Sequence, residues 1–167
     1  TDPVRAVWSE EEGLFWRPLD AAGAPAGDTV RLGARCGGGL ATATSDGSTW
    51  LACARRPNDD KDVAGVLSIE RRDGSGQVVQ RTLVRPVGRD AAGVSMVASG
   101  GGVRVAWHDG VPGAWRVWWV QVDVDAEGPI DPVMVSAPRH AAGTPSLLAM
   151  EDDEVLVVWA ETWLDAG

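Results

Sequence analysis

The chain lacks tyrosine altogether and has one phenylalanine, two histidines and two cysteines among its 167 residues. Without tyrosine, chemistry that needs a tyrosine nucleophile is excluded. Two histidines cannot form a multi-histidine zinc site, and the two separated cysteines do not form a zinc-binding pattern. No apolar run approaches the roughly 20 residues that cross a bilayer as a helix. We therefore expect no membrane insertion.

Basic residues are scarce relative to acidic ones, with 15 against 24 and a net charge of −9. Nucleic-acid binding relies on a basic surplus that displaces counterions from phosphates. The composition therefore predicts no nucleic-acid partner, and it disfavours anionic membrane surfaces for the same reason. A hydrophobic fraction of 44% is typical of a folded globular chain, and this length suffices for one domain with a core.

The two cysteines, Cys36 and Cys53, allow two interpretations. They form one disulfide in an oxidising compartment, or they are two buried thiols that pack as small hydrophobic residues. The sequence leaves both open.

Internal repetition is the main feature of the sequence. Three strand-like runs end in Asp-x-x-Gly, and the glycines are spaced about 52 residues apart. A second landmark, an apolar run that ends in Trp or Cys, keeps nearly the same spacing in its later copies. The first landmark comprises Asp20/Gly23, Asp73/Gly76 and Asp125/Gly128, and the second comprises Trp8, Cys53, Trp107 and Trp159.

Each repeat contains four short strands separated by Gly, Pro and Asp turns, and no segment keeps a helical apolar period. The sequence therefore predicts an all-β fold of four-stranded antiparallel sheets, arranged as β-propeller blades. Labelled a to d within a blade, the strands run b-c-d, a-b-c-d, a-b-c-d, a-b, which makes three to three-and-a-half blades. Residues 1–167 then form one partial propeller domain, with approximate blades 1–36, 37–88, 89–139 and 140–167.

Two stretches resemble a repeat of bacterial secreted and surface β-propeller proteins, in the broad sialidase-like and lectin-like group. They are Val-Leu-Val-Val-Trp-Ala-Glu at 155–161 and Pro-Leu-Asp-Ala-Ala-Gly-Ala-Pro at 18–25. The resemblance covers essentially the whole chain, but its motifs specify a blade and no activity. It implies an extracellular or cell-envelope location and a binding module.

A closed propeller usually needs four to eight blades, so we expect a partner to complete this one. That partner is a second copy, forming a dimer with a ring of about six blades, or a second chain that supplies the missing blades. Both ends of the chain carry a b-type strand, at 4–8 and 155–159. One of these strands is surplus in a simple two-fold closure.

A group of five residues around the third repeat forms the candidate ligand-binding site. Tryptophan can offer a flat face to a sugar ring or a cation, and the neighbouring polar groups can form hydrogen bonds. We expect a carbohydrate or protein ligand here. The residues are His108, Asp109, Trp115, Arg116 and Trp118.

Other tryptophans are interpreted as packing residues. Trp119 lies as far before its Asp-x-x-Gly turn as Leu14 and Leu67 lie before theirs, which predicts a core position. Recurrence at one repeat position predicts contacts between blades for Trp8, Trp107 and Trp159.

One loop has oxygen ligands at alternate positions, which resembles the start of a calcium loop. The loop carries Asp123, Asp125 and Glu127, but Met134 stands where a calcium loop needs a bidentate Glu. We therefore expect no cofactor, and keep calcium at these three residues as the alternative.

No catalytic residue is assigned, because no serine in a strained turn accompanies either histidine. The leading hypothesis is a non-catalytic recognition or assembly module. The alternatives are a self-assembling structural propeller fragment, and a glycosidase-like enzyme that uses carboxylates at the ring centre.

Overall fold

The computed structural model describes residues 4–45, 47–55, 66–84, 91–111, 113–138 and 140–163. Within these ranges the chain forms fifteen β-strands, and the one helical segment is a 3₁₀ turn at Glu151–Asp153. The all-β prediction is confirmed. None of the described segments is a helix long and apolar enough to cross a membrane.

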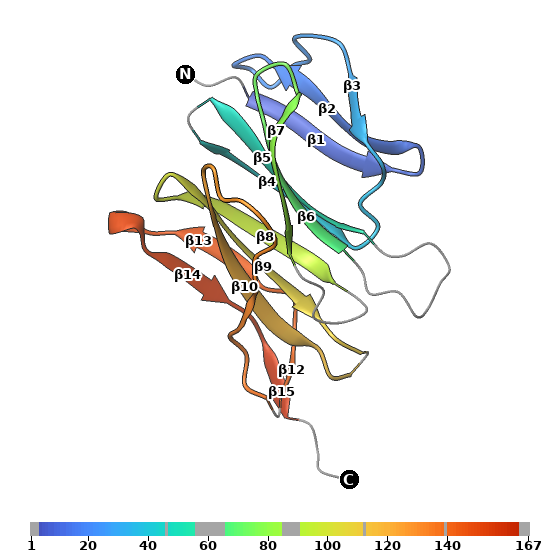
Figure 1. Cartoon of the computed structure of the whole chain (residues 1–167). Helices are drawn as coiled ribbons and strands as arrows, with labels where there is room; N and C mark the ends of the chain where they lie inside the picture. The colour runs from blue at the N-terminus through green and yellow to red at the C-terminus, as the bar shows by residue number, and fades with distance from the viewer. Residues whose placement is uncertain are drawn as a thin grey trace.

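The strands form successive antiparallel sheets, which we number as blades 1 to 4 in chain order (Figure 1). Blade 1 contains β1 (Val4–Glu10), β2 (Gly13–Leu19) and β3 (Val30–Gly33). Blade 2 contains β4 (Gly39–Ser45), β5 (Ser48–Arg55), β6 (Val66–Arg72) and β7 (Val78–Val84). Blade 3 contains β8 (Ala92–Ser99), β9 (Gly102–Asp109), β10 (Arg116–Asp123) and β11 (Val133–Met134).

Blade 4 consists of two short strand pairs. They are β13 (Ser146–Ala149) with β14 (Val155–Val158), and β12 (His140–Ala142) with β15 (Glu161–Trp163). The predicted order b-c-d, a-b-c-d, a-b-c-d, a-b is confirmed, and β12 and β15 extend the last a-b hairpin. The predicted blade boundaries at 88–89 and at 139 fall outside the described residues.

Burial shows that the blades stack face to face. Every residue of β5 except Arg55 is buried, because successive side chains point to opposite faces and both faces are covered. Trp50 and Ala52 join the core between blades 2 and 3, whereas Leu51 and Cys53 join the core between blades 1 and 2. In Figure 1 the sheets accordingly follow one another from the blue N-terminal blade to the red C-terminal hairpin.

The hairpin turns explain the Asp-x-x-Gly motif. In the first two turns the Asp20 and Asp73 side chains each accept backbone N–H bonds from the residues two and four positions later. Gly23 and Gly76 donate back to the Asp carbonyls at 3.0 Å and have φ of 80° and 90°. Glycine adopts this left-handed conformation without steric cost.

The third turn corrects the predicted register by two residues. Strand β10 ends at Asp123, and Ala126 N–H donates to the Asp123 carbonyl, so the turn begins at Asp123 and not at Asp125. Cross-strand pairing therefore places Val117, fully buried, at the position of Leu14 and Leu67. Trp119, which the motif spacing places in the core, is only half-buried, and the Arg104 guanidinium lies over its ring.

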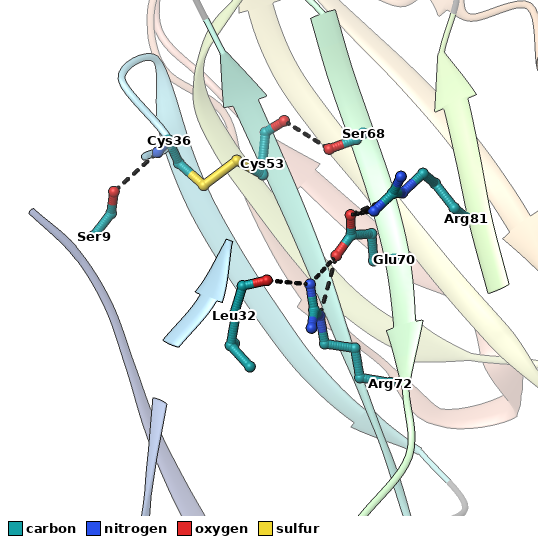
Figure 2. The surroundings of a disulfide bond; sticks show 8 residues. All are labelled: Ser9, Leu32, Cys36, Cys53, Ser68, Glu70, Arg72 and Arg81. Atoms are coloured by element: carbon teal, nitrogen blue, oxygen red, sulfur yellow. Dashed lines mark hydrogen bonds and ion pairs between the residues drawn. A yellow bond between two sulfur atoms is a disulfide. The ribbon is translucent and has the colours of Figure 1, made fainter. Parts of the chain in front are cut away.

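The junction between blades 1 and 2 carries both a disulfide and a buried ion pair (Figure 2). Of the two interpretations of the cysteines, the structure has the disulfide, Cys36–Cys53. The Arg72 guanidinium lies between the Glu70 carboxylate, at 2.5 Å, and the Leu32 carbonyl of blade 1, at 3.0 Å. Glu70 and Arg72 are 4% and 5% exposed, so this pair links the two blades from inside the interface.

Candidate functional site

Four of the five predicted ligand-binding residues lie at one end of blade 3. His108 and Asp109 end β9, Trp115 lies just before β10, and Arg116 begins it. The His108 and Trp115 rings stack with centroids 4.7 Å apart. The structure therefore brings the aromatic and imidazole parts of the predicted site into contact.

Arg116 uses its guanidinium to fix backbone rather than to face an open surface. Its Nη1 donates to the carbonyls of Trp115 at 3.0 Å and His140 at 2.5 Å, and its Nη2 donates to Pro138 at 2.6 Å. These bonds tie the start of β10 to the loop that leads into blade 4. The arrangement gives Arg116 a positioning role.

Trp118 does not join this group. It pairs across the sheet with Trp107, and its ring packs against the core between blades 2 and 3. Since residues 117 and 118 point to opposite faces of the sheet, Trp118 lies on the blade 2 side. Asp109 belongs to the same end of blade 3 but is only 3% exposed.

The structure also has a second cluster at this end, which was not predicted from the sequence. His140 Nδ1 lies 2.5 Å from Glu161 Oε2, and the rings of His140 and Trp163 have centroids 4.0 Å apart. Trp163 is 72% exposed. The sequence signal for this cluster is weak. An acid two residues after the repeated Trp recurs in several blades, so Glu161 does not stand out, and its partner His140 has no counterpart in the other repeats.

The Glu161 carboxylate is held by several donors. Its Oε1 accepts the Trp159 indole N–H at 2.7 Å and the Ala137 backbone N–H at 3.0 Å. These two bonds, with the Trp159 bond the stronger cause, hold the pKa of Glu161 below its ordinary value, and the His140 bond acts in the same direction. The carboxyl group is therefore ionised at neutral pH.

The calcium candidates are dispersed over one turn and its flank. Asp123 Oδ1 accepts the Gln121 side-chain N–H at 2.7 Å, Asp125 Oδ1 lies 4.0 Å from Arg71, and Glu127 is exposed. Across the part of the chain that the structure describes, no three His, Cys, Asp or Glu side chains are grouped so that they could hold a metal ion.

No protein-family model and no curated protein matches the chain. A solved structure that resembles it is a mannose phosphorylase from Leishmania mexicana, in complex with phosphate ion. The two are 9% identical with a TM-score of 0.46, over 95% of this chain. The chain spans 57% of that protein. A likeness at this level carries no argument about activity, and the description as propeller-type blades comes from the sheets themselves.

Proposed function

We propose that the chain is a non-catalytic assembly module whose two end faces bind further propeller blades. The observation that carries this proposal is a difference in burial between equivalent positions. Positions that are fully covered inside the stack are exposed at its ends. The partner we propose is a second copy of the chain.

The outer face of blade 4 exposes apolar side chains at positions that are buried inside the stack. Counted from the repeated Trp or Cys position, Leu156 and Val158 correspond to Trp50 and Ala52 of blade 2. Trp50 and Ala52 are 1% and 0% exposed beneath blade 3, whereas Leu156 and Val158 are 47% and 53% exposed. Leu148 pairs across the hairpin with Leu156 and is exposed too. We call Leu148, Leu156 and Val158 the back face.

The outer face of blade 1 is uncovered in the same way. Val4 and Trp8 correspond to Val103 and Trp107, which are 0% and 1% exposed against blade 2. In blade 1, Val4 is 57% exposed and Trp8 is half-buried, with its ring stacked on Phe15 at 5.8 Å. We call Val4, Ala6, Trp8 and Phe15 the front face.

The sheet edges are incomplete at the same two places. Among the described residues, β1 has no neighbour on the side where β4 and β8 complete blades 2 and 3. Strand β14 likewise pairs with β13 and has no third strand. Unpaired strand edges and uncovered apolar faces favour pairing with another sheet.

A second copy suits both ends, because one chain carries both halves of a blade interface. Each internal interface joins the back of one blade to the front of the next. A front face and a back face on the same chain favour head-to-tail contact, which closes a ring when the rotation permits. Because the front and back faces stack blade 1 on blade 4 as separate sheets, two copies of blades 1 to 4 give a ring of about eight blades, the upper end of the range for closed propellers.

A non-catalytic role is supported by the inner strands. Strands β4 and β8 lie side by side, and Gly93 N–H donates to the Gly38 carbonyl across this inner junction. Neither strand carries Asp or Glu, and β13 carries none either. These strands therefore offer no carboxylate pair for glycoside hydrolysis.

An extracytoplasmic location belongs to the same proposal. It is supported by the Cys36–Cys53 disulfide, because structural disulfides persist mainly in oxidising compartments.

The test is the mass in solution, measured by sedimentation over a range of micromolar concentrations. We expect a dimer or a larger head-to-tail species for the unaltered chain, and a monomer for Val158→Glu and for Val4→Glu. Val79→Glu is the matched control, because Val79 is 53% exposed on β7 and lies outside both faces. This control should keep the mass of the unaltered chain.

A mixture of the two variants tests whether the contact between copies is head-to-tail. A mixture of Val4→Glu and Val158→Glu chains retains one intact front-to-back contact, so it should form a dimer that neither variant forms alone. A strictly monomeric unaltered chain would contradict the proposal. Assembly that one face variant abolishes and the other leaves intact would replace head-to-tail contact with a contact between like faces.

A further inference from the structure

We propose that the surface formed by His140, Glu161 and Trp163 binds a neutral saccharide. In this site a sugar ring lies against the exposed Trp163 indole, and a sugar hydroxyl forms a hydrogen bond with His140 Nε2. The site uses no residue of the front or back face, so it is independent of the assembly proposed above.

The first observation is the concentration of ring side chains at one end of blades 3 and 4. Both histidines of the chain lie there, each in ring contact with a tryptophan, His108 with Trp115 and His140 with Trp163. Trp163 is 72% exposed, so most of its indole is open to solvent. A large exposed aromatic side chain is a typical feature of a binding surface.

The second observation is the hydrogen bonding of the two His140 ring nitrogens. Glu161 is ionised and only accepts hydrogen bonds, so His140 Nδ1 carries the proton that it donates to Oε2 at 2.5 Å. The other ring nitrogen, Nε2, is an acceptor in the neutral ring and a donor in the protonated ring, and a hydroxyl group can pair with either form. Within the described ranges no side chain or backbone group bonds to Nε2, which leaves it available to a ligand hydroxyl.

The third observation is that the pair is held in place. The His140 carbonyl accepts from Arg116, and two residues later Ala142 N–H donates to the Trp115 carbonyl at 2.9 Å. The Glu161 carboxylate is anchored by Trp159 and Ala137. A recognition site gains affinity when its groups are ordered before the ligand arrives.

These groups select the ligand class. Oε1 of Glu161 already accepts two N–H groups and Oε2 a third, so its charge is engaged within the protein. Arg116, whose Nη1 donates to the His140 carbonyl, has its guanidinium engaged by backbone carbonyls. The surface thus offers a flat apolar ring beside a ring nitrogen that can form a hydrogen bond, which fit a pyranose with its apolar C–H face and rim of hydroxyls.

The experiment is electrophoresis in native gels that contain a neutral polysaccharide, with mannan, laminarin, xylan and galactomannan as separate probes. We expect at least one of them to retard the chain. Trp163→Ala should weaken that binding at least about tenfold, which corresponds to the loss of about 1.4 kcal/mol of binding free energy. Trp119→Ala is the matched control, since Trp119 is a half-buried tryptophan outside the site, and it should bind like the unaltered chain.

Two histidine variants separate hydrogen bonding from structure. His140→Ala should lose binding, and His140→Gln, which retains a side-chain acceptor, should recover part of it. Thermal unfolding of each variant reports whether the blade is intact. The proposal is overturned if none of the four polysaccharides retards the chain, or if Trp163→Ala and Trp119→Ala behave alike. Equal binding by the two histidine variants removes the role of Nε2.

Discussion

At the scale of single residues, the arginines that contact Glu70 show how burial changes the contribution of an ion pair to stability. Glu70 is contacted by two arginines, of which Arg72 is buried and Arg81 is 56% exposed. An ion pair at the surface contributes little because water screens it. Removing one partner of a buried pair leaves an uncompensated charge, which is strongly destabilising.

We therefore expect Arg72→Met and Arg81→Met to differ, although both remove an arginine bonded to Glu70. Arg72→Met should lower the free energy of unfolding by about 3 kcal/mol, because it also breaks the bonds to the Leu32 and Gly76 carbonyls. Arg81→Met should cost about 0–1 kcal/mol. Urea unfolding of the two variants measures the difference, and equal losses would show that burial of the pair is unimportant.

The candidate site residues show which contacts could not be predicted from the sequence. His108, Trp115 and Arg116 were predicted to lie together, and they do, because they flank one short turn. The pair His140 and Glu161 was not predicted, because it depends on β12 and β15 pairing beyond the break between β12 and β13. Whether any of these residues binds a ligand stays a prediction.

At the scale of elements, the turn residues and the lack of a helical apolar period predicted the strands correctly, but the motif spacing gave the wrong register for β10. The segment from 123 to 128 contains two aspartates that could each begin a turn, and only pairing with β9 selects Asp123. That choice moves Val117 into the core and leaves Trp119 half-buried. Motif spacing alone cannot detect such a shift, because cross-strand hydrogen bonds determine the register.

The glycines of the first two turns provide a matched pair of substitutions. Both have positive φ, but a Cβ at Gly76 would lie 2.7 Å from the Trp16 ring of blade 1, whereas a Cβ at Gly23 would meet nothing within 4 Å. Gly23→Ala should cost about 1–2 kcal/mol for the left-handed conformation. Gly76→Ala should cost about 1–3 kcal/mol more for the clash. Thermal or urea unfolding compares them, and equal costs would contradict the contact between the turn and Trp16.

At the scale of the whole molecule, stability is expected to fall from the middle of the stack toward its ends. Blades 2 and 3 are covered on both sides and share the largest buried cluster, whereas blade 4 contributes two short strand pairs and exposes its outer face. Segments with few buried apolar contacts open at low free energy. The sequence predicted the incomplete blades, but the uneven coverage of their faces emerges only from the stacking.

Amide hydrogen exchange on the monomeric Val158→Glu chain tests this gradient. Amides of β5 and β9 should exchange slowest, and those of β13 and β14 should exchange faster. In the assembled unaltered chain, β13 and β14 should gain protection while β5 and β9 change little. Uniform protection in the monomer would mean that the blades unfold as one unit without regard to their neighbours.

The position of the disulfide has a practical consequence. Cys36 and Cys53 are 8% and 3% exposed, and they are the only cysteines of the chain. Because both residues are buried, we expect a reductant to react with these sulfurs chiefly when the first sheet separates from the second. The rate at which dithiothreitol reduces the native protein therefore reports how often the two sheets separate. No other thiol in the chain contributes to the measured signal.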